Sequence, residues 1–534
     1  MIIANKLDSS RLRLHPFLIL ALLGFIAMLP AFFLGHIIGH SSILNVNWAE
    51  GFAGQLRAGE LYPRWLPAMT GGGGSPVFYF YGPLPFFIAA PFVLLTGNAA
   101  IAVIFASTLM LILSGCACYI LCRNFVAPRA ALLGAAVYML LPYHFDVDIW
   151  FRSAFGEQAS FVFMPLAIAS IYKLKDDNRS IIFLALSFAG LVFSHIPSTL
   201  LFTPILAILI LAFAFQQNSN AVIFRAALAA GLAGGLTAIY LLPAVALQSM
   251  IQQWRWAKFL PEDNLLFTIQ TVAVFKYFLI PIWLVILLVA LLSFFVLSNR
   301  VHFKMLWPWI LVGFIVILAC QDFTAPLWAK AGLFKVIQFP WRALSILDLT
   351  FAVLVSYFWE NERKSRYFLS TALVIVIVLP MVLAVFSQLQ KYQTAPDGKS
   401  EFTVSEMVQF DLKSDAAEYL PSCMIVPEAL RERSMTKANA ELNKIAIVEP
   451  SSRPIYYFPF LSAKLNGKVL PMTCDPATGY VKFESPQVGE ISFTKTALPI
   501  EVIAGRVSSI SAVLILILSI FIWKRRKEPV GRTA

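Results

Sequence analysis

The sequence predicts an all-α polytopic membrane protein with about twelve transmembrane helices and a C-terminal β-rich domain before the last helix. Of its 534 residues, 59% are hydrophobic and only 13% are charged. Soluble proteins carry about 25% charged residues, so this surface cannot face water on all sides. The net charge is +12, but the basic residues lie between apolar runs instead of forming one patch. We therefore expect membrane lipids, and no nucleic acid, as partners.

The apolar runs set the number of helices. About 20 residues cross a ~30 Å hydrocarbon core. The expected spans are 16–36, 99–122, 130–142, 158–172, 180–194, 197–215, 226–246, 272–298, 305–320, 342–359, 367–388 and 507–523. A further run at 79–96 contains Pro83, Pro85 and Pro91. We expect it to be a re-entrant or interfacial helix that does not cross.

The basic residues of the short connections predict the orientation, because such loops face the cytoplasm. Lys6, Arg11 and Arg13 precede the first run, which lacks a small-x-small cleavage site and is expected to be an uncleaved signal anchor. If 79–96 does not cross, all later basic groups also face the cytoplasm. The expected outer segments are 37–98, 143–157, the turn at His195, 247–271, 321–341 and 389–506.

The chain divides into three parts. Residues 1–388 are the transmembrane module with its outer loop 37–98, residues 389–506 a water-soluble domain, and residues 507–534 the last helix with a basic cytoplasmic tail. Asn466-Gly467 is a hairpin signal. Alternating residues at 480–484 and 491–494 indicate strands, so we expect a small β-sandwich.

The cysteines fall into two groups. Cys116, Cys118, Cys122 and Cys320 lie in apolar runs as small hydrophobes, and we assign no metal site to the first three. Cys423 and Cys474 are the two cysteines of the outer domain. In an oxidising periplasm they are expected to form a disulfide.

The first outer loop offers the first candidate site. Residues 43–58 have the spacing of an amphipathic helix, which Gly59 would end. The segment Tyr62-Pro63-Arg64-Trp65 follows at the membrane interface, as a plain anchor or as part of a binding site. His36 and His40 are spaced i, i+4 but lack the Glu of a zinc hydrolase motif, so interfacial histidines are favoured over metal ligands.

Three further outer segments carry charge. Asp146 and Asp148 form an Asp-x-Asp pair that could chelate Mg²⁺ or Mn²⁺, or Asp148 could simply pair with Arg152. His195 lies at an outer helix end, where a structural donor is the usual role. Gln338-Phe339-Pro340-Trp341-Arg342 places an arginine beside aromatic residues, as a phosphate ligand or a snorkelling side chain.

Seven stretches together resemble a bacterial membrane-protein family labelled 6-pyruvoyl-tetrahydropterin synthase-related, similar in design to GT-C glycosyltransferases. They are LRAGELYPRW (56–65), GSPVFYFYGPLPFF (74–87), DIWFRSAFGEQASFVFMPL (148–166), SHIPSTLL (194–201), YLLPAV (240–245), QFPWRAL (338–344) and YYFPFLSAKLNGK (456–468). The resemblance implies a GT-C-like module in the bacterial inner membrane with a periplasmic C-terminal domain. It also implies transfer of a sugar from a polyprenyl-phosphate carrier to an envelope glycan or lipid on the periplasmic face.

The sequence departs from the family pattern at one place. The first outer loop of the family usually carries an Asp and, four residues later, a His. Those positions hold Ser41 and Asn45. The catalytic candidates are therefore Glu50, Asp148 and Asp146, with a carboxylate as general base. The candidate substrate-binding residues are Arg57, Tyr62, Arg64, Trp65, Arg152, Glu157, His195, Gln338 and Arg342.

Two functions follow from these residues. The first is the glycosyltransferase that the resemblance implies. The alternative is a non-catalytic membrane protein that binds or translocates a polyprenyl-linked intermediate, which the replacements at Ser41 and Asn45 favour. The sequence assigns no cofactor, and a divalent cation, Mg²⁺ or Mn²⁺, is the candidate ion.

Overall fold

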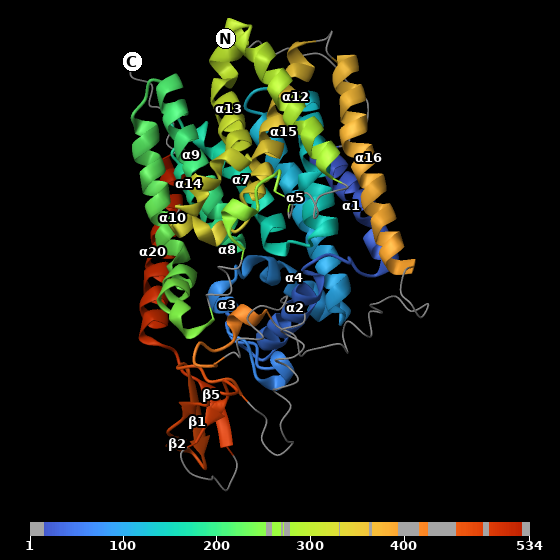
Figure 1. The fold of residues 1–534 in the computed structure, drawn as a ribbon. Coiled ribbons are helices and arrows are strands. Elements are labelled where there is room, and N and C mark those ends of the chain that lie inside the picture. Colours follow the sequence, from blue (N-terminus) through green and yellow to red (C-terminus); the bar gives the residue numbers. More distant parts are fainter. Residues whose placement is uncertain are drawn as a thin grey trace, which may run out of the picture.

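The computed structural model describes residues 15–252, 259–268, 271, 278–330, 332–362, 366–393, 416–425, 455–483 and 491–525. Helices dominate these ranges (Figure 1). Ten are long and apolar enough to span a membrane within the described residues. They are α1 (Pro16–Leu34), α5 (Ala99–Cys122), α6 (Pro128–Leu140) with the π-helix η2 (Tyr143–Phe151), α9 (Ile196–Gln216), α10 (Ala221–Ala246), α12 (Leu279–Leu297), α13 (Arg300–Ala319), α15 (Leu344–Asn361), α16 (Arg366–Gln393) and α20 (Pro499–Arg525).

Two shorter apolar helices complete the expected set, α7 (Phe155–Ile171) and α8 (Arg179–Ser194). The run at 79–96 forms α3 (Val77–Phe80) and α4 (Leu84–Thr96). At 1.5 Å per residue, the 13 residues of α4 reach only about 20 Å, which is too short for the hydrocarbon core. In Figure 1, α2 (Ser42–Arg57), α3 and α4 lie together at the end of the bundle that carries the sheet. The predicted helical polytopic fold is thus confirmed.

Local sequence signals set several helix ends. Pro16 and Pro128 start α1 and α6, where the missing proline N–H costs nothing. The Asn98 side chain caps α5 by accepting a hydrogen bond from the Ile101 amide at 3.1 Å. Gly35 and Gly97 end α1 and α4 in the left-handed conformation that glycine adopts at little cost.

Hydrogen bonds gather the basic connections at one end of the bundle. The Ala127 amide donates to Glu360 (2.6 Å), and His302 pairs with Glu362 (3.1 Å). The Gln216 side chain donates to the Lys304 carbonyl (3.0 Å). The Lys175 side chain donates to the Gln217 carbonyl (2.9 Å), and the Arg225 side chain donates to the Lys175 carbonyl (2.7 Å). One linked surface therefore holds the loops after α5, α7, α9, α12 and α15, as the parity of twelve crossings requires.

The outer segments meet at the other end. The Leu266 amide donates to the Cys320 carbonyl (3.0 Å), and the Gln252 amide to the Leu420 carbonyl (3.1 Å). The Tyr456 amide donates to the Gly73 carbonyl (2.8 Å), which joins the sheet region to the first outer loop. In Figure 1, α20 (red) rises from the sheet region along the side of the bundle. The chain thus separates its loops into two faces, one basic and one that carries the small β-region.

The described part of the outer region is small and antiparallel. Strands β1 (Leu461–Leu465), β2 (Lys468–Leu470) and β5 (Ile491–Lys495) form a sheet in the order β2-β1-β5, and β3 (Thr473–Cys474) pairs with β4 (Val481–Lys482). Asn466 and Gly467 have φ angles of 48° and 84°, which confirms the predicted two-residue hairpin. Cys423 and Cys474, the expected pair, are joined by a disulfide. These strands lie in the segment 455–500 that the sequence predicts to be β-rich. Residues 394–415, 426–454 and 484–490 of the predicted outer domain lie outside the described residues, so the β-sandwich stays a prediction.

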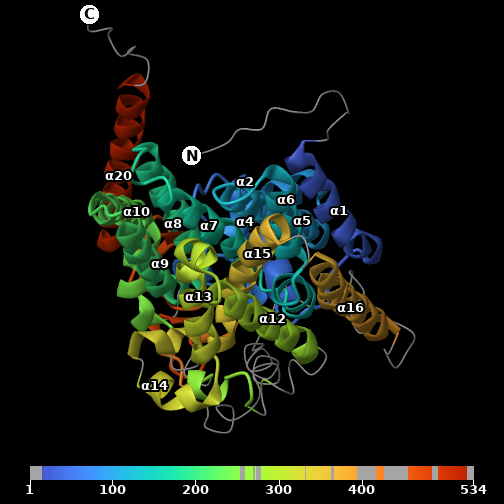
Figure 2. The ribbon, with the colours of Figure 1, turned by 90° about the horizontal axis from the view of Figure 1, so that it is seen from above.

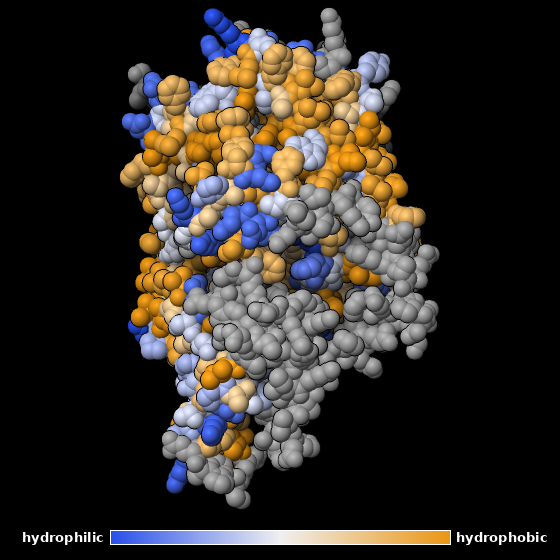
Figure 3. Space-filling view, in the orientation of Figure 1, coloured by the Kyte–Doolittle hydropathy of each residue, from blue (hydrophilic) through white to orange (hydrophobic). Residues whose placement is uncertain are grey.

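The helices at the centre of the bundle and those at its surface differ in how many apolar side chains they expose. Viewed along the bundle in Figure 2, α15 lies near the centre, whereas α1, α16 and α20 lie at the periphery. The central helix is almost completely buried, while the peripheral helices expose large apolar side chains. Figure 3 shows such apolar residues over much of the visible helical surface. This surface fits lipid.

Candidate functional site

Two buried arginines meet at the end of the bundle that carries the sheet. Arg152 Nη1 lies 2.8 Å from Asp148 Oδ1 and 2.8 Å from Glu157 Oε2. Arg342 Nε lies 3.4 Å from the same Glu157 oxygen. Both carboxylates are fully buried, and the two arginines are nearly so. We call Arg152, Arg342, Asp148 and Glu157 the paired-arginine cluster.

Three segments build this cluster. Asp148 and Arg152 are four residues apart along η2 and its C-terminal end, so they share one helix face. Glu157 is in the first turn of α7. Arg342 comes from almost 200 residues further along the chain, in the 3-10 turn Pro340–Ala343 that leads into α15. Only the fold brings Arg342 close to Glu157, because the spacing of residues along the chain does not predict this contact.

Neighbouring aromatic residues hold the charges in place. The Tyr143 hydroxyl donates to Glu157 Oε1 at 2.7 Å. The Arg152 guanidinium lies 4.7 Å from the centre of the Trp341 ring, and Arg342 lies 4.8 Å from that of Phe339. These cation–π contacts fix the planes of both guanidinium groups.

The cluster has unused hydrogen-bonding capacity. Within the described residues, Asp148 Oδ2 and Arg342 Nε are buried and have no hydrogen-bond partner. Arg342 Nη1 donates to the Ile337 carbonyl at 2.6 Å. A buried polar atom without a partner costs free energy, and such atoms gather where a ligand completes the set. The charges of two arginines and two carboxylates balance, which leaves a preorganised but incompletely bonded site.

The N-terminus of α7 adds positive potential beside Arg342. A side chain on Gly156 would come within 3.1 Å of the Tyr81 hydroxyl and 2.9 Å of the Ser194 carbonyl, so only glycine permits this approach. Burial raises the pKa of Tyr81 to about 12, against the opposing influence of Arg342. Tyr81 therefore stays a neutral hydroxyl at the edge of the cluster.

His195 lies at the same edge but has a structural partner. It is the N-cap of α9, and its Nδ1 lies 2.8 Å from the Ser198 hydroxyl. Burial lowers the pKa of His195, and the charge of Arg342 lowers it further. As the cap, the neutral ring accepts a hydrogen bond from the Ser198 amide at 3.4 Å, so His195 has a structural role, but as an acceptor and not as the predicted donor.

Unusual backbone conformations flank both arginines. Ser153, which follows Arg152, has φ 51°, and Gln338, which precedes the Arg342 turn, has φ 61°. Residues other than glycine rarely adopt positive φ angles, and such strain concentrates at functional sites. No sequence signal indicates either conformation.

The first outer loop is attached directly to the cluster. The amides of His40 and Ser41 donate to the carbonyls of Phe151 (3.1 Å) and Arg152 (2.9 Å). Asn45 Nδ2 donates to the Ser153 carbonyl at 2.6 Å. The positions that the family resemblance fills with Asp and His therefore lie beside Arg152, and here they bind its backbone.

Arg64 belongs to a second buried cluster. It lies 3.2 Å from Glu501 Oε1 at the start of α20 and donates to the Ile239 carbonyl at 2.7 Å. The Tyr79 hydroxyl donates to Glu501 Oε1 at 3.2 Å, and the Leu498 amide to Glu501 Oε2 at 2.9 Å. We call Arg64, Glu501 and Tyr79 the anchor cluster, because it ties the last helix to the first outer loop. Tyr62 packs on this arginine, with 4.2 Å between the guanidinium and the ring centre.

The remaining candidates of the first loop lie apart from the paired-arginine cluster. Residues 42–57 form α2, which confirms the predicted amphipathic helix. Its Glu50 and Arg57 are exposed, and no described contact joins them to the cluster. Trp65 packs against Phe458 and Phe460 of the sheet region, with ring centres 5.5 Å apart in each case. The structure thus brings Arg152, Arg342, Asp148 and Glu157 together. Glu50, Arg57 and Trp65 have no described contact with this cluster.

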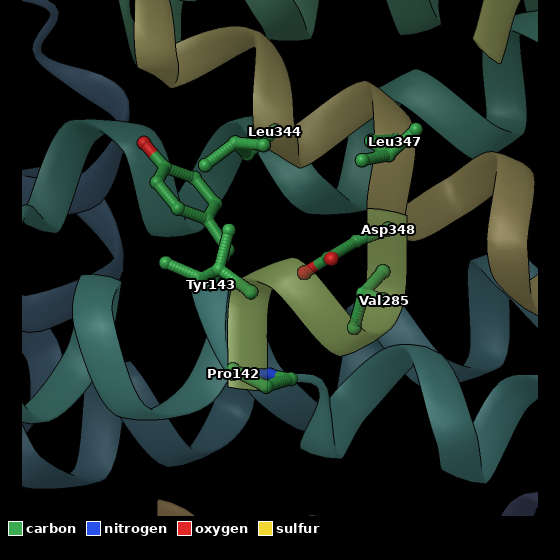
Figure 4. Close-up of a pocket in the computed structure, with 7 residues that line it drawn as sticks. Pro142, Tyr143, Val285, Leu344, Leu347 and Asp348 are labelled. Atoms are coloured by element: carbon green, nitrogen blue, oxygen red, sulfur yellow. The ribbon is translucent and has the colours of Figure 1, made fainter. Parts of the chain in front are cut away.

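Asp146 has a different neighbour, which the sequence analysis missed. It is fully buried, neither of its oxygens has a hydrogen-bond partner among the described residues, and it interacts electrostatically with Asp348. Asp348 is in α15 and accepts a hydrogen bond from the His144 amide at 3.1 Å. Figure 4 shows its carboxyl at a small cavity that Pro142, Tyr143 and Val285 help to line. The sequence signal for this site is Asp348 itself, since a single acid within the apolar run 342–359 is costly in a membrane and indicates function.

The two carboxyls of the Asp-x-Asp pair do not converge on one ion. Residues two apart on a helix lie on nearly opposite sides, so Asp148 reaches Arg152 whereas Asp146 approaches Asp348. In the described part of the chain, no group of three or more His, Cys, Asp or Glu side chains is placed to hold a metal ion. The donor set of Asp146 and Asp148 therefore does not fit a shared Mg²⁺ or Mn²⁺.

Fold and site together define a polytopic membrane protein with a charged site buried at one end of its helix bundle. Residues 78–392 match the family described as "6-pyruvoyl-tetrahydropterin synthase related domain; membrane protein". The chain belongs to this family, as its seven sequence stretches indicated. No curated protein sequence matches it.

Several solved structures have a similar chain path at low identity. The mycobacterial arabinofuranosyltransferase AftD is 15% identical with a TM-score of 0.47, over 72% of this chain and 28% of that one. The Archaeoglobus fulgidus oligosaccharyltransferase in its apo form is 12% identical with a TM-score of 0.44, over 72% and 58% of the two chains. The same organism's AglB in complex with an inhibitory peptide and a dolichol-phosphate is 15% identical with a TM-score of 0.34, over 83% and 61%. The chain thus spans less than two thirds of each of these proteins.

Proposed function

We propose that this protein is a glycosyltransferase of the GT-C type that uses a polyprenyl-phosphate-linked sugar as donor. It would act in the bacterial inner membrane, with its sheet region in the periplasm, on an envelope glycan or lipid. The observation that carries the proposal is the paired-arginine cluster, which lies on the face opposite the basic loops. Family membership and the resemblance of the seven stretches support it.

The cluster has the parts that a phosphate leaving group requires. Arginine binds phosphate oxygens through two parallel N–H groups, and a desolvated site strengthens these bonds. Arg342 Nε is buried and makes no hydrogen bond, although Glu157 Oε2 lies 3.4 Å from it, and the N-terminus of α7 is beside it. Glu157 contacts both arginines and would hold them in position while the phosphate gains charge.

The other residues take supporting roles in this proposal. Tyr81 and His195 would line the edge of the phosphate site, and Asp148 would orient Arg152. Gln338 would set the turn that presents Arg342. Arg64, Tyr62 and Trp65 would connect the first loop, the sheet region and α20 around the donor, without contact to its phosphate.

The test measures lipid binding and transfer separately. Wild-type protein in nanodiscs is given undecaprenyl phosphate and a panel of radiolabelled undecaprenyl-phosphate sugars. Arg342→Gln is expected to weaken undecaprenyl phosphate binding at least 10-fold and to abolish transfer. Arg179→Gln, on the basic face, is the matched control and is expected to bind like the wild type. Equal binding by Arg342→Gln and wild type would refute the phosphate site.

The same experiment distinguishes the alternative function, which is binding or translocation of a polyprenyl-linked intermediate without sugar transfer. Ser41 and Asn45 occupy the positions of the usual acid and histidine, and Asn45 binds the Ser153 carbonyl. A protein that only binds or translocates a polyprenyl-linked intermediate would show Arg342-dependent binding with no glycosylated product from any donor of the panel.

A further inference from the structure

We propose that His40 is the general base that accepts the proton of the acceptor hydroxyl, in place of the Asp that the family usually carries where this chain has Ser41. This inference deepens the proposed glycosyl transfer and rests on it. Three observations on the described residues carry it: the engagement of the nearby carboxylates, the placement of His40, and its exposure.

The carboxylates around the site are already engaged or distant. Asp148 and Glu157 are both bound to Arg152, and an arginine partner makes a carboxylate a poor proton acceptor. Glu60 is paired with Lys495 at 2.8 Å. Asp146 is fully buried on the far side of η2. Glu50 is exposed on α2 without a described contact to the cluster. Because no described contact brings Glu50 or another unpaired carboxylate to the cluster, a residue of another kind that is fixed at its edge is the better-placed base.

The backbone holds His40 beside the cluster. Its amide donates to the Phe151 carbonyl (3.1 Å), and the amide of its neighbour Ser41 donates to the Arg152 carbonyl (2.9 Å). A Cβ on Gly39 would lie 2.9 Å from the Ser153 amide nitrogen, so the glycine allows this close approach. Two hydrogen bonds and one glycine thus fix the loop segment 39–41 against the residues that follow η2.

His40 differs from the other groups of the site in its exposure. The paired-arginine cluster is buried, whereas His40 is exposed at its outer edge. An acceptor glycan arrives from water, and a lipid phosphate arrives from the membrane. A base at the aqueous edge with arginines behind it has the arrangement that such a reaction needs.

The electrostatic surroundings favour the form of the ring that accepts a proton. Although His40 keeps an exposed surface, the protein covers part of its ring, and this partial burial lowers the pKa of His40; the charge of Arg152 lowers it further. The imidazole is therefore neutral at neutral pH. His36, four residues earlier, is buried and does not share this exposure.

The proposed step balances. A ring nitrogen of His40 takes the proton of the acceptor hydroxyl as its oxygen forms a bond to the anomeric carbon of the donor sugar. The bond between that carbon and the phosphate oxygen breaks, and polyprenyl phosphate leaves with the electron pair. Arg342 and Arg152 stabilise its charge, and His40 later releases its proton to water.

The test is chemical rescue in nanodiscs, with the donor on which the wild type is active. His40→Ala is expected to lower kcat by roughly 100-fold or more, since general bases contribute about 10²–10⁴-fold. Binding of undecaprenyl phosphate and the KM for the donor should stay unchanged. Added imidazole should restore part of the rate, because the position is exposed. His15→Ala, an exposed histidine at the opposite end, is the control and should keep full activity.

The pH profile separates a base from a structural residue. Wild-type kcat is expected to fall only below about pH 6.5, the ordinary pKa of histidine, because its pKa is lowered. His40→Asp should retain transfer, with this fall moved to lower pH. A His40→Ala variant with wild-type kcat, or a reduced rate that imidazole does not raise, would overturn the role of His40 alone. An inactive wild type that binds undecaprenyl phosphate would overturn the proposed function and this role together.

Discussion

The paired-arginine cluster and the anchor cluster contain the same kinds of groups and differ in how completely these are bonded. In the anchor cluster, Arg64 and Glu501 are matched one to one, and the Leu498 amide and Tyr79 hydroxyl complete the carboxylate. In the paired-arginine cluster, Asp148 and Arg342 each keep a buried atom without a hydrogen bond. Saturated ion pairs are structural elements, whereas unsaturated ones are candidates for ligand binding.

The largest effect is expected from Glu157, the carboxylate that both arginines contact. Glu157→Ala leaves two buried guanidinium groups with a single acid, and losing one partner of a buried pair costs about 3–5 kcal/mol. Thermal unfolding in detergent should show this loss. Asp177→Ala breaks the solvent-exposed pair with Arg179 and should lower the melting temperature far less than Glu157→Ala. Equal losses in the two variants would contradict the burial argument.

The anchor cluster is expected to tolerate replacement as a unit. Arg64→Met alone leaves Glu501 buried without its cation and should destabilise by about 3–5 kcal/mol. Arg64→Met with Glu501→Met removes both charges and should recover most of that stability. Undecaprenyl phosphate binding by the double variant should equal that of the wild type. Weakened binding by a stable double variant would assign Arg64 to the phosphate site and end the distinction between the clusters.

The smallest effect is expected from Asp146, which has no cation partner in the described structure. Because a buried carboxyl without a hydrogen bond destabilises the fold, Asp146→Asn should leave stability unchanged or raise it by about 1 kcal/mol. The measurement is again thermal unfolding, with Asp148→Asn as the contrast that loses an arginine partner. A large loss for Asp146→Asn would show that this side chain holds an ion or water.

The parts of the site that lie close together in the chain can be predicted from the sequence. Arg152 with Asp148 and Glu157, and Arg342 beside its aromatic residues, were all recognised as candidates. Arg64 was predicted to belong with them, because an arginine beside aromatic residues gives the same sequence pattern in a binding site and in a structural anchor. Asp348 was missed because it lies inside an apolar run that was read only for its length. His40 was considered as an interfacial residue, and only the hydrogen bonds to Phe151 and Arg152 bring it to the cluster.

What the sequence determined by itself is the membrane architecture. Apolar run lengths, prolines and basic connections predict the spanning helices, the short α4 and the two faces, because bilayer thickness and the cost of charge act on every segment separately. Of the twelve predicted spans, ten are long and apolar enough to cross a membrane in the described residues, and α7 and α8 are shorter apolar helices. The tertiary structure alone decided which arginine is a ligand candidate and which is an anchor. Each depends on a partner far away in the chain, since Glu157 and Arg342, like Arg64 and Glu501, meet only when the helices pack.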